Sequence, residues 1–240
     1  MNKSILKITF YTYIFSILIL LVAFKEEVTI FILLQYSMFF LCISYLIFRY
    51  FIESSIKIFS LASKITYIRL SISILLLTVS INSNISSSIF DIFYTERVFI
   101  LLAIIALLLD GLDGFIARKY DQVSKFGELI DQEADNFLMF VMSISLYLNR
   151  EIGLYVFLIP AYRYIFIISM AKYPWLKYTL PNSQLRKVGC AGTILIMIIS
   201  QDPYITNDVT VFLVILSLII ITFSFSRDII WLYRNKYEKI

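Results

Sequence analysis

The chain of 240 residues contains no histidine, and this absence restricts its chemistry more than any other feature of the composition. Zinc enzymes, Ser-His-Asp hydrolases and phospholipase-D-like enzymes all rely on imidazole side chains. The sequence therefore disfavours these three classes. If the protein catalyses a proton transfer, the proton must move through Asp, Glu, Lys, Tyr or water.

Cysteine and charged residues are also scarce. The two cysteines, Cys42 and Cys190, both lie in apolar runs and lack the spacing of metal ligands, so we interpret them as packing residues. Charged residues make up 16% of the chain and hydrophobic residues 60%, whereas charged residues form about a quarter of a typical globular domain. This composition predicts an integral membrane protein.

Eight apolar runs approach the length of about 20 residues that a helix needs to cross a bilayer. They lie near residues 8–24, 28–48, 66–81, 98–118, 130–148, 152–171, 188–201 and 209–232. The first run resembles the start of a signal peptide, but no small-x-small cleavage site follows it. We therefore interpret it as a retained membrane anchor.

The distribution of lysine and arginine predicts the orientation. If all eight runs cross, most of the 21 Lys and Arg residues fall on one side, Lys25, Arg97 and Arg150 fall on the other, and Arg163 and Arg227 lie within spans. Short cytoplasmic loops retain Lys and Arg, so the N-terminus and the loop 119–126 are expected to face the cytoplasm.

The connecting segments are less distinctive. Apolar residues in 49–64 are spaced as in a helix that lies in the membrane interface, although an ordinary cytoplasmic connector fits equally well. The segments 81–97 and 201–208 are rich in Ser, Asn, Asp and Pro and are expected to be loops.

One charged stretch, "DGLDGFIARKYDQVSKFGELIDQEAD" at 110–135, interrupts this apolar chain with seven acidic residues. Asp110 and Asp113 are three residues apart and Asp131 and Asp135 are four apart, so each pair lies on one face of a helix. Four converging carboxylates repel one another unless cations neutralise them. Because every available ligand is oxygen, Mg²⁺ or Mn²⁺ is favoured, and four carboxylates suit two such ions about 3.5–4 Å apart in phosphoryl chemistry.

Small residues beside the acids leave room for a bulky ligand to bind there. Gly111, Gly114 and Ala117 keep one helix face open, and Gly127 opens the opposite wall. Arg118 supplies a planar guanidinium group suited to phosphate oxygens. The stretch therefore favours metal-assisted phosphoryl transfer.

This stretch resembles the signature of the class I CDP-alcohol phosphotransferases. All eight fixed positions match: Asp110, Asp113, Gly114, Ala117, Arg118, Gly127, Asp131 and Asp135. Upstream, "SKITYIR" at 63–69 resembles the family's Pro-Asn-x-x-Thr-x-x-Arg motif, with Thr66 and Arg69 matching and with Ala62 and Ser63 in place of Pro and Asn. The resemblance implies an all-α membrane fold, with a six-helix catalytic core over 62–240 preceded by two extra transmembrane helices and a connector in 1–61.

The resemblance also implies roles for individual residues. Asp110, Asp113 and Asp131 look like ligands of two divalent cations, Mg²⁺ or Mn²⁺, and Asp135 looks like both a ligand and the catalytic base. The CDP-binding positions carried over are Gly114, Ala117, Arg118, Ser124, Gly127 and Thr66. The other acids, Asp121, Glu128 and Glu133, match no fixed position, so we interpret them as helix surface or loop.

The implied reaction transfers a phosphatidyl group from CDP-diacylglycerol to an alcohol in phospholipid biosynthesis and releases CMP. Arg163, Arg186 and Lys187 are candidates to hold a phosphate on the acceptor, which favours a phosphorylated polyol such as glycerol 3-phosphate. Arg163 could equally pair with the aspartates for structural reasons, and cytoplasmic retention alone could explain Arg186 and Lys187. We expect an enzyme of the bacterial inner membrane whose active site faces the cytoplasm. We expect no nucleic-acid partner, and a homodimer is a candidate assembly.

Two alternatives stay open at this point. Intramembrane carboxylates also line the cation paths of ion-coupled transporters, but that reading leaves the Gly-x-x-Ala-Arg spacing unexplained, and the chain shows no inverted repeat. The other alternative is a structural membrane protein that has kept the signature and lost the activity.

Overall fold

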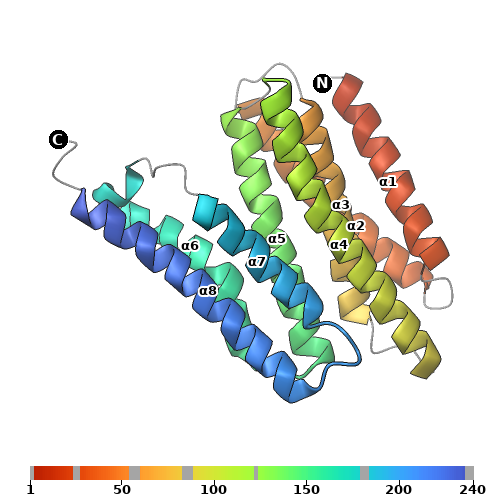
Figure 1. Cartoon of the computed structure of the whole chain (residues 1–240). Helices are drawn as coiled ribbons and strands as arrows, with labels where there is room; N and C mark the ends of the chain where they lie inside the picture. Colours follow the sequence, from red (N-terminus) through yellow and green to blue (C-terminus); the bar gives the residue numbers. More distant parts are fainter. Residues whose placement is uncertain are drawn as a thin grey trace.

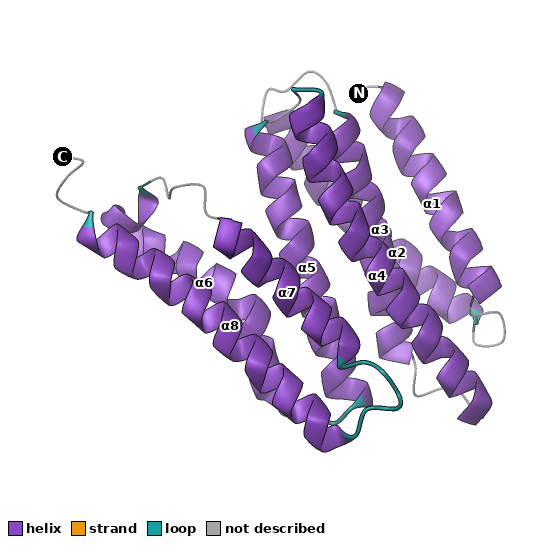
Figure 2. Ribbon diagram, in the orientation of Figure 1, coloured by secondary structure: helices purple, strands orange, loops and turns teal. Residues whose placement is uncertain are grey.

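A computed structural model of the chain describes residues 3–23, 28–53, 60–82, 89–121, 124–178 and 184–235. Within these ranges, side chains are described except those of residues 3–5, 23, 89–95, 177 and 184–187. Every regular element in the described ranges is helical (Figure 2).

Eight α-helices account for most of the described chain. They are α1 (Lys3–Ala23), α2 (Ile30–Glu53), α3 (Leu61–Asn82), α4 (Ile89–Lys119), α5 (Lys125–Asn149), α6 (Leu158–Lys172), α7 (Gln184–Ile199) and α8 (Asn207–Arg234). Two short 3-10 turns, η2 (Leu154–Phe157) and η3 (Pro174–Lys177), flank α6. Each predicted apolar run corresponds to one of these helices, so the all-α fold is confirmed.

Five helical segments of the described chain are long and apolar enough to cross a membrane: Ile30–Glu53, Leu61–Asn82, Glu96–Lys119, Leu154–Lys172 and Asn207–Arg234. Shorter apolar segments, Leu6–Val22 and Val188–Ile199, lie in α1 and α7. The one remaining helix, α5, has 25 residues and is long enough to span, but its first half carries four of the acidic residues of the 110–135 stretch.

Two expectations about connectors need correction. The segment 81–97 was expected to be a loop, but α3 continues to Asn82 and α4 begins at Ile89, because residues 89–97 contain neither Gly nor Pro to stop a helix. The expected interfacial helix at 49–64 is divided, since 49–53 end α2 and 61–64 begin α3. Residues 54–59 of that segment lie outside the described ranges.

Helix α3 forms the centre of the bundle. Its apolar window is 83% buried, against 17–28% for the other four candidate spans, because α4 and α5 pack on one side and α1 and α2 on the other (Figure 1). Its buried hydroxyl groups donate to backbone carbonyls of the preceding turn at Ser73, Thr78 and Ser80. Such local bonds satisfy polar groups where no water is present.

The remaining helices, α6 to α8, form a second group, joined to the first where α7 packs on α4 and α5 and where α6 packs on α5 (Figure 1). The first turn of α1, the turn between α4 and α5, and the last turn of α8 lie at the same end of the bundle. An even number of crossings from α1 to α8 requires this common end; the side of the membrane that it faces stays a prediction.

Candidate metal and active site

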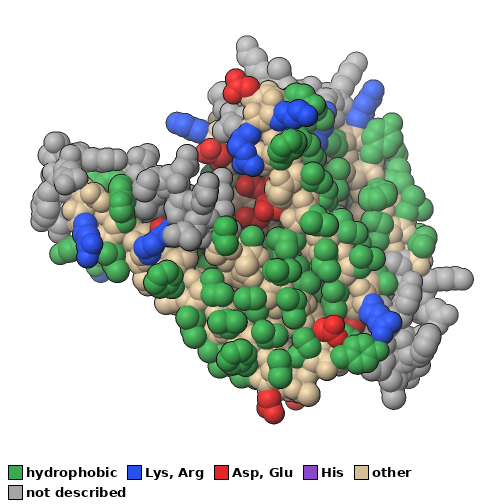
Figure 3. All heavy atoms as spheres, in the orientation of Figure 1, with side chains coloured by type: hydrophobic (Ala, Val, Ile, Leu, Met, Phe, Trp, Pro, Cys, Tyr) green, Lys and Arg blue, Asp and Glu red, His purple; other side chains and the backbone are tan. Residues whose placement is uncertain are grey.

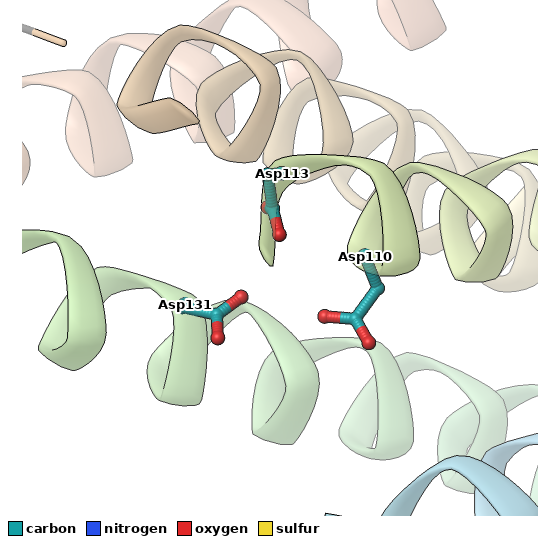
Figure 4. Close-up of side chains that lie close together, drawn as sticks. All are labelled: Asp110, Asp113 and Asp131. Atoms are coloured by element: carbon teal, nitrogen blue, oxygen red, sulfur yellow. The ribbon is translucent and has the colours of Figure 1, made fainter. Parts of the chain in front are cut away.

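Three aspartates from two helices converge in the space between α4 and α5. Asp110 and Asp113 come from α4 and Asp131 from α5, and their carboxyl groups point toward one another (Figure 4). One carboxylate oxygen from each lies within 4.8 Å of the others. Asp113 is buried, and Asp110 and Asp131 are partly exposed. This is the spacing of a site that could hold a divalent cation through oxygen ligands.

Arg69 of α3 lies against these carboxylates. Its guanidinium group is fully buried and forms ion pairs with Asp110, with Asp131 at 2.8 Å and with Asp135 at 3.2 Å. It also donates to the backbone carbonyl of Asp131 at 3.0 Å. One guanidinium can balance only one of four aspartates, so the cluster retains excess negative charge, which further cations would neutralise. The donor set therefore fits divalent cations.

Thr66 lies one turn before Arg69 on the same face of α3. Its hydroxyl is 2.8 Å from Asp113 Oδ2 and is buried. The resemblance assigned Thr66 to nucleotide binding, whereas the structure places it against a predicted metal ligand. Thr66 and Arg69 together orient carboxylates of both α4 and α5.

Arg118 lies over Gly114 at the end of α4. The guanidinium group folds back along the helix, and a Cβ atom at position 114 would lie 3.4 Å from one of its terminal nitrogens, an ordinary contact. Arg118 is exposed and Ala117 is partly exposed. The guanidinium group is therefore accessible to phosphate oxygens next to the aspartates.

The first turn of α5 forms the opposite wall. Ser124 is the N-cap residue, and its hydroxyl accepts a hydrogen bond from Gly127 N at 3.0 Å. A Cβ atom at Gly127 would lie 3.1 Å from Ser124 Oγ and 3.9 Å from Ser63 Oγ of α3. Gly127 thus packs close to Ser124 and Ser63, and a side chain at this position would press on the cap.

Acidic side chains are visible in a recess between the two helix groups, with Lys and Arg side chains around its upper edge (Figure 3). In the same orientation, the turn between α4 and α5 lies at the top of Figure 1, above the position of the recess in Figure 3. An anionic ligand would therefore approach past cations before it reaches the carboxylates.

The family model of CDP-alcohol phosphatidyltransferases matches residues 59–225, more than half of the chain. The chain belongs to this family. Membership shows that it is a phosphotransferase of multi-pass membrane architecture, and it implies transfer of a phosphatidyl group from a CDP-alcohol to an acceptor alcohol. Among curated proteins and among solved structures, no significant match was found.

Within this CDP-alcohol phosphatidyltransferase, Arg163 lies on α6 and faces α5. Its guanidinium group donates to Glu133 at 2.6 Å and to Gln132 at 2.9 Å, and Tyr164 lies 3.4 Å from the same glutamate. Arg163 thus pairs with an acid, but that acid is Glu133 and none of the four signature aspartates. Glu133 lies on the helix surface as expected, with its side chain 38% exposed, but it is paired with Arg163.

The other predicted residues fall as follows. Asp121 and Glu128 are exposed, as expected, and Asp121 adopts a positive φ of 51° in the turn after α4. Asp135 projects from α5 one turn after Asp131 and meets Arg69. The backbones of Arg186 and Lys187 belong to α7, but their side chains lie outside the described part of the structure.

Sequence reasoning missed the role of Arg69 in the site. It matched the upstream motif at that position, but we did not place it with the aspartates. A signal was present, because a cation inside an apolar span needs acidic partners. The three-residue spacing from Thr66 to Arg69 also puts both side chains on one helix face.

Proposed function

We propose that this protein transfers the phosphatidyl group of CDP-diacylglycerol to an alcohol and releases CMP. The observation that carries the proposal is the convergence of Asp110, Asp113 and Asp131, three signature residues whose ligand atoms lie within 4.8 Å of one another. The open guanidinium group of Arg118 beside Gly114 supports a diphosphate ligand at the same place.

The proposed metal ligands are Asp110, Asp113, Asp131 and Asp135, which would hold two Mg²⁺ or Mn²⁺ ions. When bound, such ions polarise phosphate oxygens and neutralise charge in the displacement. Arg69 would keep the carboxylates in place, since it contacts Asp110, Asp131 and Asp135 at once.

In the proposed reaction, Asp135 accepts the proton of the acceptor hydroxyl. The acceptor oxygen attacks the phosphorus that carries the diacylglycerol group, a new P–O bond forms, and the P–O bond to CMP breaks. Arg118, Gly114 and Ser124 would contact the CDP part, with Ala117 and Gly127 leaving room for it and Thr66 holding Asp113.

The acceptor is proposed to be a phosphorylated polyol such as glycerol 3-phosphate. Arg163 supports this choice as a guanidinium group on the wall that α6 adds to α5. An acceptor phosphate would compete with Glu133 for that group, and phosphate and carboxylate bind a guanidinium through the same fork geometry.

Substitution of Arg163 tests the acceptor class. We expect Arg163→Gln to raise KM for glycerol 3-phosphate by about 10- to 100-fold, the range for a lost charge-assisted hydrogen bond, and to leave KM for CDP-diacylglycerol unchanged. Arg97→Gln is the matched control, because Arg97 donates to Tyr204 at 2.7 Å and lies at the other end of the bundle. An equal loss with an uncharged acceptor would show that Arg163 acts through folding alone.

Substitution of Gly127 tests the nucleotide wall. The new Cβ of Gly127→Ala meets Ser124 Oγ at 3.1 Å, so the cap must shift, which costs about 1 kcal/mol and offsets a helix-propensity gain of about 1 kcal/mol. We therefore expect little change in thermal stability but a KM for CDP-diacylglycerol raised about fivefold.

Gly192→Ala on α7 is the control for Gly127→Ala, because a Cβ atom there meets nothing within 4 Å. It should leave KM unchanged. If both glycine variants give the same KM, the close contact of Gly127 with Ser124 has no part in nucleotide binding.

We also propose a bacterial inner-membrane location with the site facing the cytoplasm, and a division into an N-terminal part, 1–61, and a catalytic part, 62–240. The lysine and arginine distribution and the common end of α1, α8 and the α4–α5 turn support the orientation.

An acceptor panel identifies the alcohol. Purified protein with CDP-diacylglycerol and Mg²⁺ is incubated separately with glycerol 3-phosphate, inositol phosphate, serine, choline and phosphatidylglycerol, and lipid products are detected by mass spectrometry. A product with serine or choline alone would overturn the phosphorylated acceptor.

A further inference from the structure

Helices α1 and α2 precede residues 59–225, the part that the family model matches, yet both pack on α3 and side-chain hydrogen bonds attach α2 to it. Ser44 of α2 bonds to Tyr67 of α3 at 2.6 Å, and Asn82 near the other end of α3 donates to Gln35 of α2 at 2.9 Å. Contacts at two levels fix the position of α2 along α3. Tyr67 is the neighbour of Thr66, which holds Asp113.

The last turns of α2 also contact the first turn of α5. The ring of Phe51 packs edge-on against Phe126, with centroids 5.2 Å apart, and the ring of Tyr50 stacks on Phe126 at 5.7 Å with 14° between the planes. Phe51 is 7% exposed and Phe126 is 3% exposed. Phe51 and Phe126 therefore form a buried contact between α2 and α5, and Tyr50, which is 38% exposed, covers its outer side.

Phe126 occupies a particular place in α5. It lies between Ser124, the N-cap residue, and Gly127, whose backbone nitrogen donates to Ser124 Oγ. Both neighbours are proposed nucleotide contacts. Because Phe126 and Gly127 are consecutive in one helical turn, a rotation or tilt that moves the Phe126 ring also moves the Ser124–Gly127 cap.

We propose that Tyr50 and Phe51 of α2 are positioning residues for the nucleotide wall of the active site, acting through Phe126 on the Ser124–Gly127 cap. This inference rests on the proposed function. It assigns α2 a role in substrate binding: its last turn holds the start of α5, while Arg69 of α3 separately holds Asp131.

This division predicts which kinetic constant changes. Arg69 anchors Asp131 and Asp135 one to two turns further along α5, so the reacting centre keeps its support when the aromatic contact is lost. Phe51→Ala should therefore raise KM for CDP-diacylglycerol about five- to tenfold, change kcat less than about twofold, and leave KM for the acceptor unchanged. The inhibition constant of CMP, a water-soluble probe of the nucleotide site, should rise by the same factor as KM.

Phe40→Ala is the matched control. Phe40 lies on the same helix, is 1% exposed, and packs on Tyr13, Tyr36 and Tyr67, away from α5. It should lower the melting temperature at least as much as Phe51→Ala while KM and the CMP inhibition constant stay unchanged. Phe51→Leu, which keeps an apolar side chain against Phe126, should recover most of the affinity, and Tyr50→Phe, which keeps the stacked ring, should match the wild type.

The outcomes separate the inference from the function on which it rests. If the wild-type protein is active but Phe51→Ala and Phe40→Ala raise KM equally, or neither raises it, the positioning role is wrong and the transferase assignment stands. A wild-type protein that neither releases CMP nor binds it contradicts both.

Discussion

Asp135→Asn is expected to lower kcat for CMP release by about 10²- to 10⁴-fold, the usual contribution of a positioned general base. An asparagine amide cannot accept the proton of the acceptor hydroxyl, and it is a poorer ligand for a hard cation than a carboxylate. The substitution should not unfold the protein, because Arg69 retains its ion pairs with Asp110 and Asp131. Initial rates of CMP release at saturating CDP-diacylglycerol measure the effect.

Glu128→Gln is the control for that experiment. Glu128 lies in the first turn of the same helix and is exposed, so the same removal of one negative charge should leave kcat within about twofold. Full activity in Asp135→Asn would remove Asp135 from the mechanism. Equal losses in both variants would show that the charge of α5, and not one carboxylate, controls the rate.

Arg69→Gln is expected to give the largest loss of stability in the protein. Arg69 is fully buried and meets three aspartates, and the removal of one partner from a buried ion-pair network costs about 3–5 kcal/mol. The melting temperature in detergent should therefore fall sharply in the presence of a chelator. Millimolar Mg²⁺ or Mn²⁺ should restore part of it, because ions that bind only the folded protein stabilise it.

Two further variants sharpen the interpretation of Arg69. Arg69→Lys keeps the charge, but an ammonium group lacks the planar fork that contacts several carboxylates, so its stability should fall between those of Arg69→Gln and the wild type. Arg150→Gln removes an arginine that lies 3.9 Å from Glu96 and donates to the backbone carbonyl of Gln201 at 2.8 Å. It should cost about 1–2 kcal/mol and show no recovery by Mg²⁺, because neither contact involves the aspartates. An unchanged melting temperature in Arg69→Gln would contradict the central role of this side chain.

The sequence predicts the helices well because crossing a bilayer imposes length and apolarity on each of them. It predicts segment ends poorly where polar residues continue a helix beyond the bilayer, as at Ile89 of α4. It also gives no sign that α2 reaches α5, since the contact of Phe51 with Phe126 joins residues far apart in the chain. Apolar periodicity is weak in a membrane helix, so it does not show which face meets which partner.

Within the site, fixed spacing predicts that the aspartates share helix faces, and the structure brings Asp110, Asp113 and Asp131 together. The partners of these residues follow from helix packing, which the spacing does not contain. Arg69 reaches the cluster because α3 packs on both α4 and α5. Glu133 becomes the partner of Arg163 because α6 packs on another face of α5 from the one that carries Asp131.

The most direct test of the central claim is the release of CMP from CDP-diacylglycerol by the purified wild-type protein in detergent. We predict release that requires both an acceptor alcohol and Mg²⁺ or Mn²⁺, that stops on chelation, and that resumes when either ion is added back. No release with any acceptor of the panel at saturating Mg²⁺ and Mn²⁺, from protein with a cooperative melting transition, would contradict the assignment of phosphatidyl transfer.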